Sequence, residues 1–390
     1  MRRVSLPERP DWRDHAAQAG FSFHTFDDAP YWDESAYYAF TLAEIEDGIE
    51  EPTREIHALC LAFAERAVAD DAILASLAIP EHAWDAVANS FRRRDPSLYG
   101  RLDLSYGGNG TGPAKLLEYN ADTPTALYES AVFQWLWLED GLARGRLPPG
   151  ADQFNALHER LIARLAGMGL PDGLAFACFP DAPEDRGTIA YLQDCAVQAG
   201  LSTSFVSLEA IGLSDEGCFV DAESRTLAAL FKLYPWEWMF ADAFGLSVGA
   251  SSTRFVEPPW KAVLSNKGLL AHLWAMAPGH PNLLPAYFED DPAKAALGTS
   301  FVKKPLYSRE GANILLVRDG KLLERDEGPY GSEGYVRQAL AELPVFDGRH
   351  ALVGSWIVGD DPAGLCMREG PSRITTERAC FVPHLVGVCD

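Results

Sequence analysis

The chain has 390 residues, of which 47% are hydrophobic and 23% are charged, as in an ordinary globular protein with a large core. Its formal net charge of −23 argues against binding of a nucleic-acid backbone, which requires clustered lysines and arginines. No apolar run has the length of a membrane span, and proline and charge interrupt residues 1–7 before a signal-peptide core can form, so we expect a cytoplasmic protein.

The cysteines and histidines give no sign of a metal or redox site. The seven cysteines lack C-x-x-C spacing, and the nine histidines form no H-E-x-x-H motif. We therefore expect the cysteines to be buried, reduced thiols that act as small apolar residues, namely Cys60, Cys178, Cys195, Cys218, Cys366, Cys380 and Cys389.

In chain order, the pattern predicts helices, then a hairpin, then an α/β unit and then a second set of strands. The rings between residues 31 and 40 are expected to pack in a core or cleft wall, and Thr41 and Glu44 have capping-box spacing. Apolar strands at 174–178 and 204–206 flank a helix at 188–199, which makes a small doubly wound unit. Further helices are expected at 53–69, 81–91, 126–142, 153–168 and 265–274, and hairpin strands at 218–220 with 228–234 and at 351–358 with 365–369.

The stretch 101–125 carries the densest set of reactive side chains. Apolar residues alternate with Arg101 and Asp103 in one short strand and with Glu118 and Asn120 in the next, so these four side chains share one face. The simplest register sets Asp103 opposite Glu118 and Arg101 opposite Asn120. Facing carboxylates repel, so a cation is expected between them, and carboxylate and amide oxygens suit Mg²⁺. The alternative is a solvated hairpin with ordinary surface charges.

The glycine-rich loop of this hairpin does not match a nucleotide-binding motif. A Walker loop needs a lysine directly after its last glycine and then a helix, whereas Pro113 follows Gly112 and a strand comes next. No G-x-G-x-x-G fingerprint and no G-x-S-x-G elbow fit either. Strands at 300–305 and 314–317, in contrast, flank a loop of small residues, as a flexible phosphate cover requires.

The most distinctive motifs of the chain lie at 115–125, 231–238, 265–267, 309–313, 354–356 and 381–384. In type and order they resemble the synthetase module of glutathionylspermidine synthase, and the resemblance covers nearly the whole chain. It implies an α+β fold of the ATP-grasp type with an associated small α/β pre-ATP-grasp subdomain for substrate. It also implies that ATP is clamped between two lobes while a carboxylate and an amine form an amide through an acyl phosphate.

The resemblance divides the single module of 1–390 into three parts. Residues 1–150 would form a helical part with the metal-binding hairpin, residues 151–250 the α/β pre-ATP-grasp subdomain, and residues 251–390 the ATP-grasp lobes with the phosphate loop.

The resemblance also gives roles to the hairpin residues. Asp103, Glu118 and Asn120 match the magnesium ligands of the family. Arg101 matches an arginine near the reacting carboxylate and transferred phosphoryl group, and Arg368 matches an arginine that stabilises charge during acyl transfer. The chemistry explains these residue types, because a carboxylate that attacks a γ-phosphoryl group approaches several negative charges, which metal ions and fixed cations offset.

Other matches concern ATP. Lys267 and Lys304 match two lysines on the ATP phosphates, with Lys303 as the less favoured alternative to Lys304. Gln338 is expected at the adenine hinge.

The loop 307–313 resembles the glycine-containing phosphate cover of the family. Arg309, Gly311 and Asn313 are its expected ATP contacts. Ser308 stands where a glycine is common in the family.

The function implied by the resemblance is an ATP- and Mg²⁺-dependent carboxylate–amine ligase that acts on small molecules such as a glutathione-like peptide and a polyamine, without nucleic acid or membrane. Thr123 and Thr125 stand where the family has small hydroxyl residues that contact the thiol-peptide substrate. Two alternatives are a ligase for a different peptide or amino acid and amine, and a non-catalytic ATP-binding regulatory protein. The complete set of metal and phosphate residues favours the enzyme.

Bifunctional relatives carry a separate amidase domain with a catalytic cysteine ahead of the synthetase. The chain offers no place for such a domain, so we expect no amidase activity.

Overall fold

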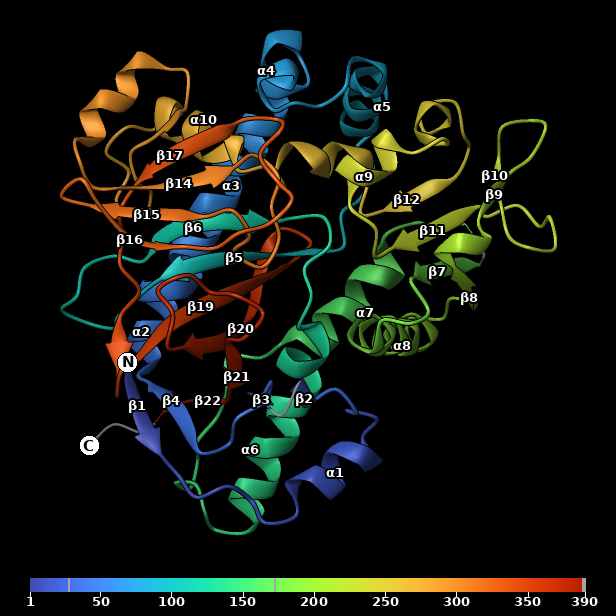
Figure 1. Ribbon diagram of the computed structural model, residues 1–390. Coiled ribbons are helices and arrows are strands. Elements are labelled where there is room, and N and C mark those ends of the chain that lie inside the picture. Colours follow the sequence, from blue (N-terminus) through green and yellow to red (C-terminus); the bar gives the residue numbers. More distant parts are fainter. Residues whose placement is uncertain (27–28, 172, 388–390) are drawn as a thin grey trace.

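The computed structural model describes residues 1–26, 29–171 and 173–387 (Figure 1). A central antiparallel sheet lies below a second antiparallel sheet, and a parallel sheet lies to one side of both. A small sheet beneath them joins β1 (Arg2–Ser5), β4 (Ala36–Phe40) and β22 (His384–Val386) near the two ends of the chain. This is a mixed α+β architecture.

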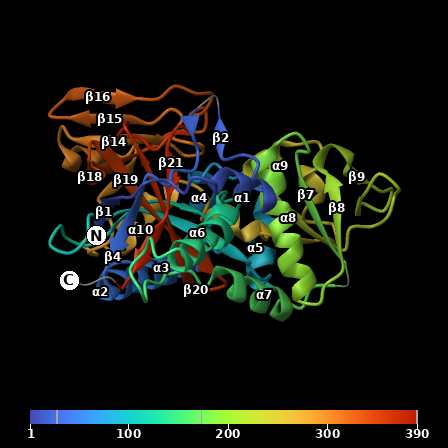
Figure 2. The same ribbon diagram turned by 90° about the horizontal axis from the view of Figure 1, so that it is seen from below.

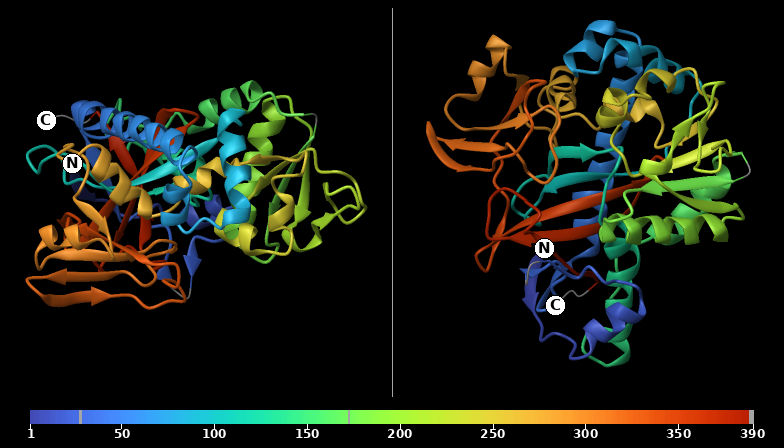
Figure 3. Two further views of the ribbon diagram at one scale, coloured as in Figure 1. Left: turned by 90° about the horizontal axis from the view of Figure 1, so that it is seen from above. Right: turned by 45° about the vertical axis from the view of Figure 1, so that its right-hand side comes forward.

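The central sheet is the main support of the molecule. Its strand order is β21-β20-β19-β5-β6, with the short β18 also paired to β19. Leu102, Leu104 and Tyr119 point from this sheet into a core that they share with helix α3 (Glu51–Ala67), which crosses behind the sheet in blue in Figure 3. The opposite face is therefore left for polar side chains. The strands are β5 (Tyr99–Ser105), β6 (Lys115–Asn120), β18 (Val345–Phe346), β19 (Arg349–Val358), β20 (Asp361–Gly370) and β21 (Cys380–Val382).

The second antiparallel sheet faces the polar side of the central sheet and has the order β13-β17-β14-β15-β16. Helix α10 (Gly268–Met276) packs against β13 and β17. The predicted strands at 300–305 and 314–317 are confirmed as β14 and β15, which pair antiparallel. The strands are β13 (Ala286–Phe288), β14 (Phe301–Pro305), β15 (Leu315–Arg318), β16 (Lys321–Arg325) and β17 (Tyr335–Ala339).

The parallel sheet has the order β12-β11-β7-β8, and helix α8 (Pro183–Gln198) connects β7 to β8. Figure 2 shows this sheet and α8 on the side of the molecule away from β14, β15 and β16. The predicted strand–helix–strand unit is confirmed as β7, α8 and β8, but the predicted pairing of 218–220 with 228–234 is wrong, because Phe219 and Val220 pair with residues 212–213 and Val220 bridges Thr226. β11 runs parallel between β7 and β12, and its residues Ala229, Leu230 and Phe231 are apolar on both faces, as in a buried parallel strand. The strands are β7 (Leu174–Cys178), β8 (Thr203–Ser207), β11 (Ala229–Lys232) and β12 (Arg254–Val256).

The remaining helices and strands lie around these sheets. The capping box at Thr41 and Glu44 is present and begins helix α2. The other helices are α1 (Trp12–Gln18), α2 (Leu42–Ile45), α4 (Asp71–Ser76), α5 (Glu81–Arg92), α6 (Gln134–Ala143), α7 (Leu157–Gly167) and α9 (Trp236–Ala241). The other strands are β2 (Thr25–Phe26), β3 (Ala29–Pro30), β9 (Gly212–Leu213) and β10 (Phe219–Val220), and β10 pairs with β9.

The cysteines of the described residues agree with the expectation from sequence. Cys60, Cys178, Cys195, Cys366 and Cys380 are buried free thiols, and Cys218 is half-buried. Cys389 lies outside the described residues. None of the described helices is long and apolar enough to cross a bilayer.

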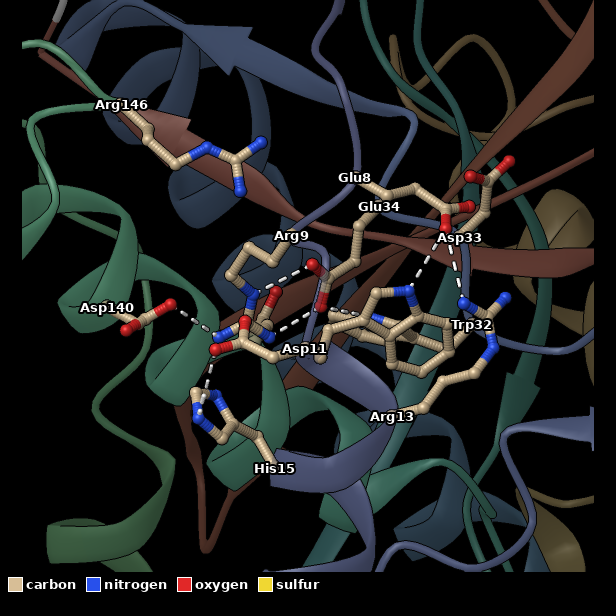
Figure 4. A network of polar contacts seen from close by, with 12 residues as sticks. Glu8, Arg9, Asp11, Arg13, His15, Trp32, Asp33, Glu34, Asp140 and Arg146 are labelled. Carbon is tan, nitrogen blue, oxygen red and sulfur yellow. Dashed lines mark hydrogen bonds and ion pairs between the residues drawn. The ribbon is translucent and has the colours of Figure 1, made fainter.

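A buried ion pair fixes the N-terminal segment to the rest of the molecule (Figure 4). The guanidinium of Arg9 donates two hydrogen bonds to the Glu34 carboxylate, at 2.8 and 2.6 Å, and a third to Asp140 of α6, at 3.2 Å. The indole of Trp32 donates to the same carboxylate at 3.1 Å. Since Arg9 and Glu34 are 3% and 1% exposed, water cannot replace either partner.

Replacing Arg9 with methionine should therefore destabilise the protein strongly, because it leaves a buried carboxylate without its cation. We expect the free energy of unfolding to fall by about 3–5 kcal/mol, measured by denaturant titration. The control is Arg13→Met, which removes an exposed arginine that pairs with Glu8 and lies over the ring of Trp12, and should cost less than about 1 kcal/mol. Equal losses in the two variants would contradict this account.

Candidate active site

A single cavity between the central and second antiparallel sheets collects nearly all of the side chains singled out in the sequence. Its walls come from β5, β6, β14, β17 and β20, from the start of α10 and from the loops near 307–314 and 371–375. The predicted site residues on its walls are Arg101, Asp103, Glu118, Asn120, Thr123, Thr125, Lys267, Lys304, Arg309, Gly311, Gln338 and Arg368.

The predicted hairpin register is confirmed. Asp103 is paired with Glu118 and Arg101 with Asn120, and a bulge follows Asp103. Arg101 Nε donates to Asp103 at 2.7 Å, and Lys267 Nζ lies 3.1 Å from the Glu118 carboxylate. Each of the two carboxylates is therefore paired with a positively charged side chain.

The charges around this pair affect the two acids in opposite directions. Burial raises the pKa of Asp103, and the charge of Glu118 raises it further against the opposing effect of Arg101. Burial would also raise the pKa of Glu118, but Lys267 and Lys304 outweigh it and lower that pKa to about 2. Glu118 is therefore a firmly ionised carboxylate at neutral pH.

The oxygen atoms of this hairpin fit a hard divalent cation. Two carboxylates and the carboxamide of Asn120 lie side by side, and Asn120 Nδ2 donates to Glu118 at 3.4 Å. Mg²⁺ binds one or two carboxylates and completes its shell with water and phosphate oxygens. Asp103, Glu118 and Asn120 are thus a donor set of suitable chemistry.

Lys304 projects into the same cavity from β14. Its Nζ donates to the Leu117 carbonyl at 2.7 Å and to Gln338 Oε1 at 2.8 Å, while Gln338 Nε2 donates to the Leu116 carbonyl at 2.9 Å. Burial lowers the pKa of Lys304 to about 8. Lys303 lies on the other face of the strand, 3.8 Å from Glu289, because side chains alternate along a strand.

The loop that follows β14 closes one side of the cavity. Lys267 Nζ donates to the Ser308 carbonyl at 2.9 Å, and Arg309 NH1 donates to Thr123 Oγ1 at 3.3 Å. Gly311 has φ +78°, and a Cβ there would meet Ile374 at 2.6 Å. Only glycine therefore allows the loop to pass this close to its neighbour.

Asn313 is the predicted site residue that the structure does not bring to the cavity wall. Its side-chain oxygen instead accepts a hydrogen bond from the Tyr330 backbone amide at 2.8 Å. Its backbone has φ +58°, a conformation that asparagine tolerates better than most residues. The Asn313 side chain therefore connects the loop 307–313 to the segment that contains Tyr330.

Two arginines of the cavity wall donate hydrogen bonds to backbone carbonyl groups. Arg101 Nη1 donates to the Thr125 carbonyl at 2.8 Å, and Arg368 Nη2 donates to the Thr376 carbonyl at 2.9 Å. Arg368 Nε is buried and has no hydrogen-bond partner among the described residues. This donor of Arg368 is therefore unused among the described residues.

Three polar residues near the cavity were not given roles from the sequence. Lys232 Nζ donates to Asp122 at 3.0 Å, and the other Asp122 oxygen accepts from the Trp236 backbone amide at 2.7 Å. Glu237 lines the cavity, and burial together with the charge of Asp122 raises its pKa to about 7. Lys232 and Glu237 belong to the motif at 231–238, and that motif is the sequence signal that could have identified them.

A second group of acids adjoins the cavity and was also missed. Tyr31 lies between Glu129 and Glu184, and burial raises the pKa of Glu129 to about 8. Asp185 follows Glu184, and burial raises its pKa to about 6. These residues come from separate segments of the chain, and no sequence pattern connects them.

Comparisons with known proteins identify the family of this chain. The family model described as glutathionylspermidine synthase preATP-grasp matches residues 3–387. A Haemophilus influenzae protein named "Putative acid--amine ligase" is 40% identical, over 98% of this chain and 99% of that protein. The bifunctional glutathionylspermidine synthetase/amidase of Escherichia coli is 26% identical over 90% of this chain, and the trypanothione synthetase of Crithidia fasciculata is 27% identical over 83%.

The last two relatives are longer than the region that they share with this chain. The match covers 60% of the Escherichia coli protein and 54% of the Crithidia fasciculata protein. The solved apo structure of a glutathione synthetase-like effector from Globodera pallida has a TM-score of 0.54 at 10% identity, over 98% of this chain and 100% of that chain. At this identity the likeness shows the fold alone, which is of the ATP-grasp type. The chain belongs to the glutathionylspermidine synthase pre-ATP-grasp family and is a carbon–nitrogen ligase.

Proposed function

We propose that this protein joins a carboxylate to an amine with ATP and Mg²⁺, through an acyl phosphate. The observation that supports it most is the single cavity in which a carboxylate hairpin, two lysines and two arginines converge. Phosphoryl transfer to a carboxylate needs this collection of oxygen ligands and cations, because negative charge accumulates on the transferred group.

We assign the ATP phosphates to the side of the cavity formed by Lys267, Lys304 and the loop with Arg309 and Gly311. Asp103, Glu118 and Asn120 would hold Mg²⁺, which would neutralise phosphate charge when it is bound. Binding of the phosphates would give Lys267 and Lys304 partners in addition to Glu118 and Gln338. The neighbouring Gln338 would lie at the adenine hinge.

We place the acid substrate beside Thr123 and Thr125, where Arg101 reaches the same segment. Arg101 and Arg368 would then stabilise the negative charge that develops on the carbonyl oxygen during acyl transfer. The position of both arginines on the cavity wall supports this role.

We place the amine beside the acids that adjoin Thr125 and Arg368. Glu184 interacts with the Thr125 side chain and is repelled by Glu310. Asp185 is repelled by both Glu184 and Glu310. Such a group of carboxylates attracts a substrate with more than one positive charge. A polyamine, as named for the Escherichia coli relative, fits this chemistry, and a glutathione-like peptide is the matching acid.

The three-part division of the chain, with the pre-ATP-grasp subdomain at 151–250, stays a prediction.

The test is release of ADP by the purified protein with panels of acids and amines. We expect ADP release to require both an acid and an amine, and the product to have the mass of the two substrates less one water. The panel should include glutathione, other small peptides and amino acids as acids, and spermidine, putrescine and monoamines as amines. Absence of both Mg-ATP binding and ADP release across the panel would refute the proposal.

A further inference from the structure

One phenol lies between two carboxyl groups at the edge of the cavity. Tyr31 Oη is 2.5 Å from Glu129 Oε1 and 3.0 Å from Glu184 Oε1. Glu129 begins a turn of π-helix ahead of α6, Glu184 lies in the first turn of α8, and Tyr31 precedes β4. Turns of π-helix inside helices are frequent at functional sites.

The number of protons in this arrangement is restricted. A phenol has one proton, so it can donate to only one of the two carboxylates. The contact with the other carboxyl group is attractive only when that group itself carries a proton. Glu129, Tyr31 and Glu184 in this geometry therefore share one additional proton.

The surroundings of Glu129 agree with the presence of one additional proton. Glu129 is 1% exposed and its Oε2 has no hydrogen-bond partner among the described residues. An ionised carboxylate in that position would be costly, and burial together with Glu184 raises the pKa of Glu129 to about 8. Burial also raises the pKa of Glu184.

The half-buried Glu184 connects the group to the cavity. Thr125 and Arg368, which line the cavity, favour its ionised form, and Glu310 of the phosphate loop disfavours it. Its neighbour Asp185 is repelled in turn by Glu184 and Glu310. The positive charge of Arg101 opposes the rise in the pKa of Glu129, and the positive charge of Arg368 opposes the rise in the pKa of Tyr31.

We propose that Glu184, Tyr31 and Glu129 form a relay that takes the proton which the attacking amine must lose. This inference rests on the proposed function, in which the amine lies beside Glu184. Glu184 is the catalytic residue, because it contacts the amine, and Tyr31 and Glu129 are positioning residues that act through it.

The proton balance of the relay closes over one turnover. The ammonium substrate binds beside Glu184, and the shared proton leaves to solvent because the new cation replaces its charge. The bound ammonium then breaks one N–H bond and gives that proton to Glu184, which passes a proton to Tyr31 as Tyr31 passes its own to Glu129.

The free amine lone pair attacks the acyl-phosphate carbonyl carbon, so that the C–N bond forms and the C–O bond to phosphate breaks. The second amine proton leaves with the phosphate. The shared-proton state is thereby restored, and the relay needs no oxidant or other co-reactant.

The first experiment separates the two halves of the reaction in Tyr31→Phe and Glu129→Gln. With glutathione as the acid, hydroxylamine, which is uncharged at neutral pH, traps the acyl group as a hydroxamate without a proton acceptor. We expect hydroxamate formation to be unchanged and amide formation with spermidine to fall by roughly 10²-fold at neutral pH. Amide formation in the variants should then rise with pH about tenfold per unit, because hydroxide replaces the relay.

Tyr128→Phe is the matched control, since the Tyr128 hydroxyl donates to the Ala19 carbonyl outside the relay. It should leave both half-reactions and the pH profile unchanged. Equal loss of hydroxamate and amide in Tyr31→Phe, or an unaltered pH profile, would overturn the relay.

The second experiment needs no substrate. Infrared difference spectra of the wild type and Glu129→Gln at neutral pH should contain the C=O stretch of a protonated carboxyl group that only the wild type possesses. Absence of this band in the wild type would overturn the shared proton. Failure of the wild type to give ADP or hydroxamate with any acid would refute the proposed function instead, and the infrared band would then decide the shared proton by itself.

Discussion

Glu118→Gln should abolish ligase turnover while the protein stays folded. Glutamine keeps the size of the side chain, but it removes a carboxylate whose pKa is lowered to about 2 by Lys267 and Lys304 and which we assign to Mg²⁺. We expect the rate of ADP release to fall by roughly 10²- to 10³-fold or more, measured at saturating ATP with a titration of Mg²⁺. Circular dichroism and thermal unfolding would show that the fold is retained.

The control for Glu118→Gln is Glu289→Gln, which removes a carboxylate that pairs with Arg337 and Lys303 away from the cavity lining. It should leave turnover and the Mg²⁺ dependence unchanged. Unchanged activity in Glu118→Gln would remove this residue from the metal site.

Lys232→Met should give the largest loss of stability among single substitutions near the cavity. Lys232 and Asp122 are 1% and 2% exposed, and Lys232 Nζ also donates to the Tyr234 carbonyl at 2.8 Å. Methionine would leave the Asp122 carboxylate buried close to Glu237. Removal of one partner of a buried ion pair costs about 3–5 kcal/mol, which denaturant titration would measure.

Lys232→Met should also weaken binding of the acid substrate. Asp122 precedes Thr123, so a shift of this segment should raise KM for the acid more than KM for ATP. The double variant Lys232→Met with Asp122→Asn should recover part of the stability, because it no longer buries an unpaired charge. If the single and double variants were equally unstable, the pair would have no special role and lost packing would explain the effect.

The arrangement of the hairpin followed from its sequence alone. Alternation of Leu102 and Leu104 with Arg101 and Asp103 assigns one face to the core and the other to the polar side, because successive side chains of a strand point in opposite directions. The simplest antiparallel register that keeps the polar side chains on one face is the one present, with Asp103 paired with Glu118. The positions of the capping box and of β14 and β15 were local signals of the same kind.

The partner of β11 could not be found in this way. Its strand was expected to pair with its nearest neighbour in sequence, whereas it pairs with β7 and β12 in a parallel sheet. A short apolar strand has two buried faces and no polar pattern to mark its neighbours, so the packing of α8 and the rest of the sheet decides the pairing.

The residues of the cavity could likewise be named from sequence motifs, but their meeting could not be predicted. The family motifs point to Lys267, Lys304 and Arg368 one by one, but no spacing in the sequence shows that they meet the hairpin. They reach the cavity from the start of α10, from β14 of the second sheet and from β20 of the central sheet, so only the packing of these elements brings them together. A motif can also include a residue that does not reach the cavity. Asn313 belongs to the motif at 309–313, but its side chain bonds to the Tyr330 backbone.

The sequence by itself determined the composition, the polar face of the hairpin, the family and the residue types of the candidate site. Only the tertiary structure brought Tyr31 between Glu129 and Glu184, and Lys232 against Asp122. The physical reason is that local pattern reports which side of an element is buried, whereas the protonation and charge of a buried acid depend on neighbours from distant segments that only packing brings together.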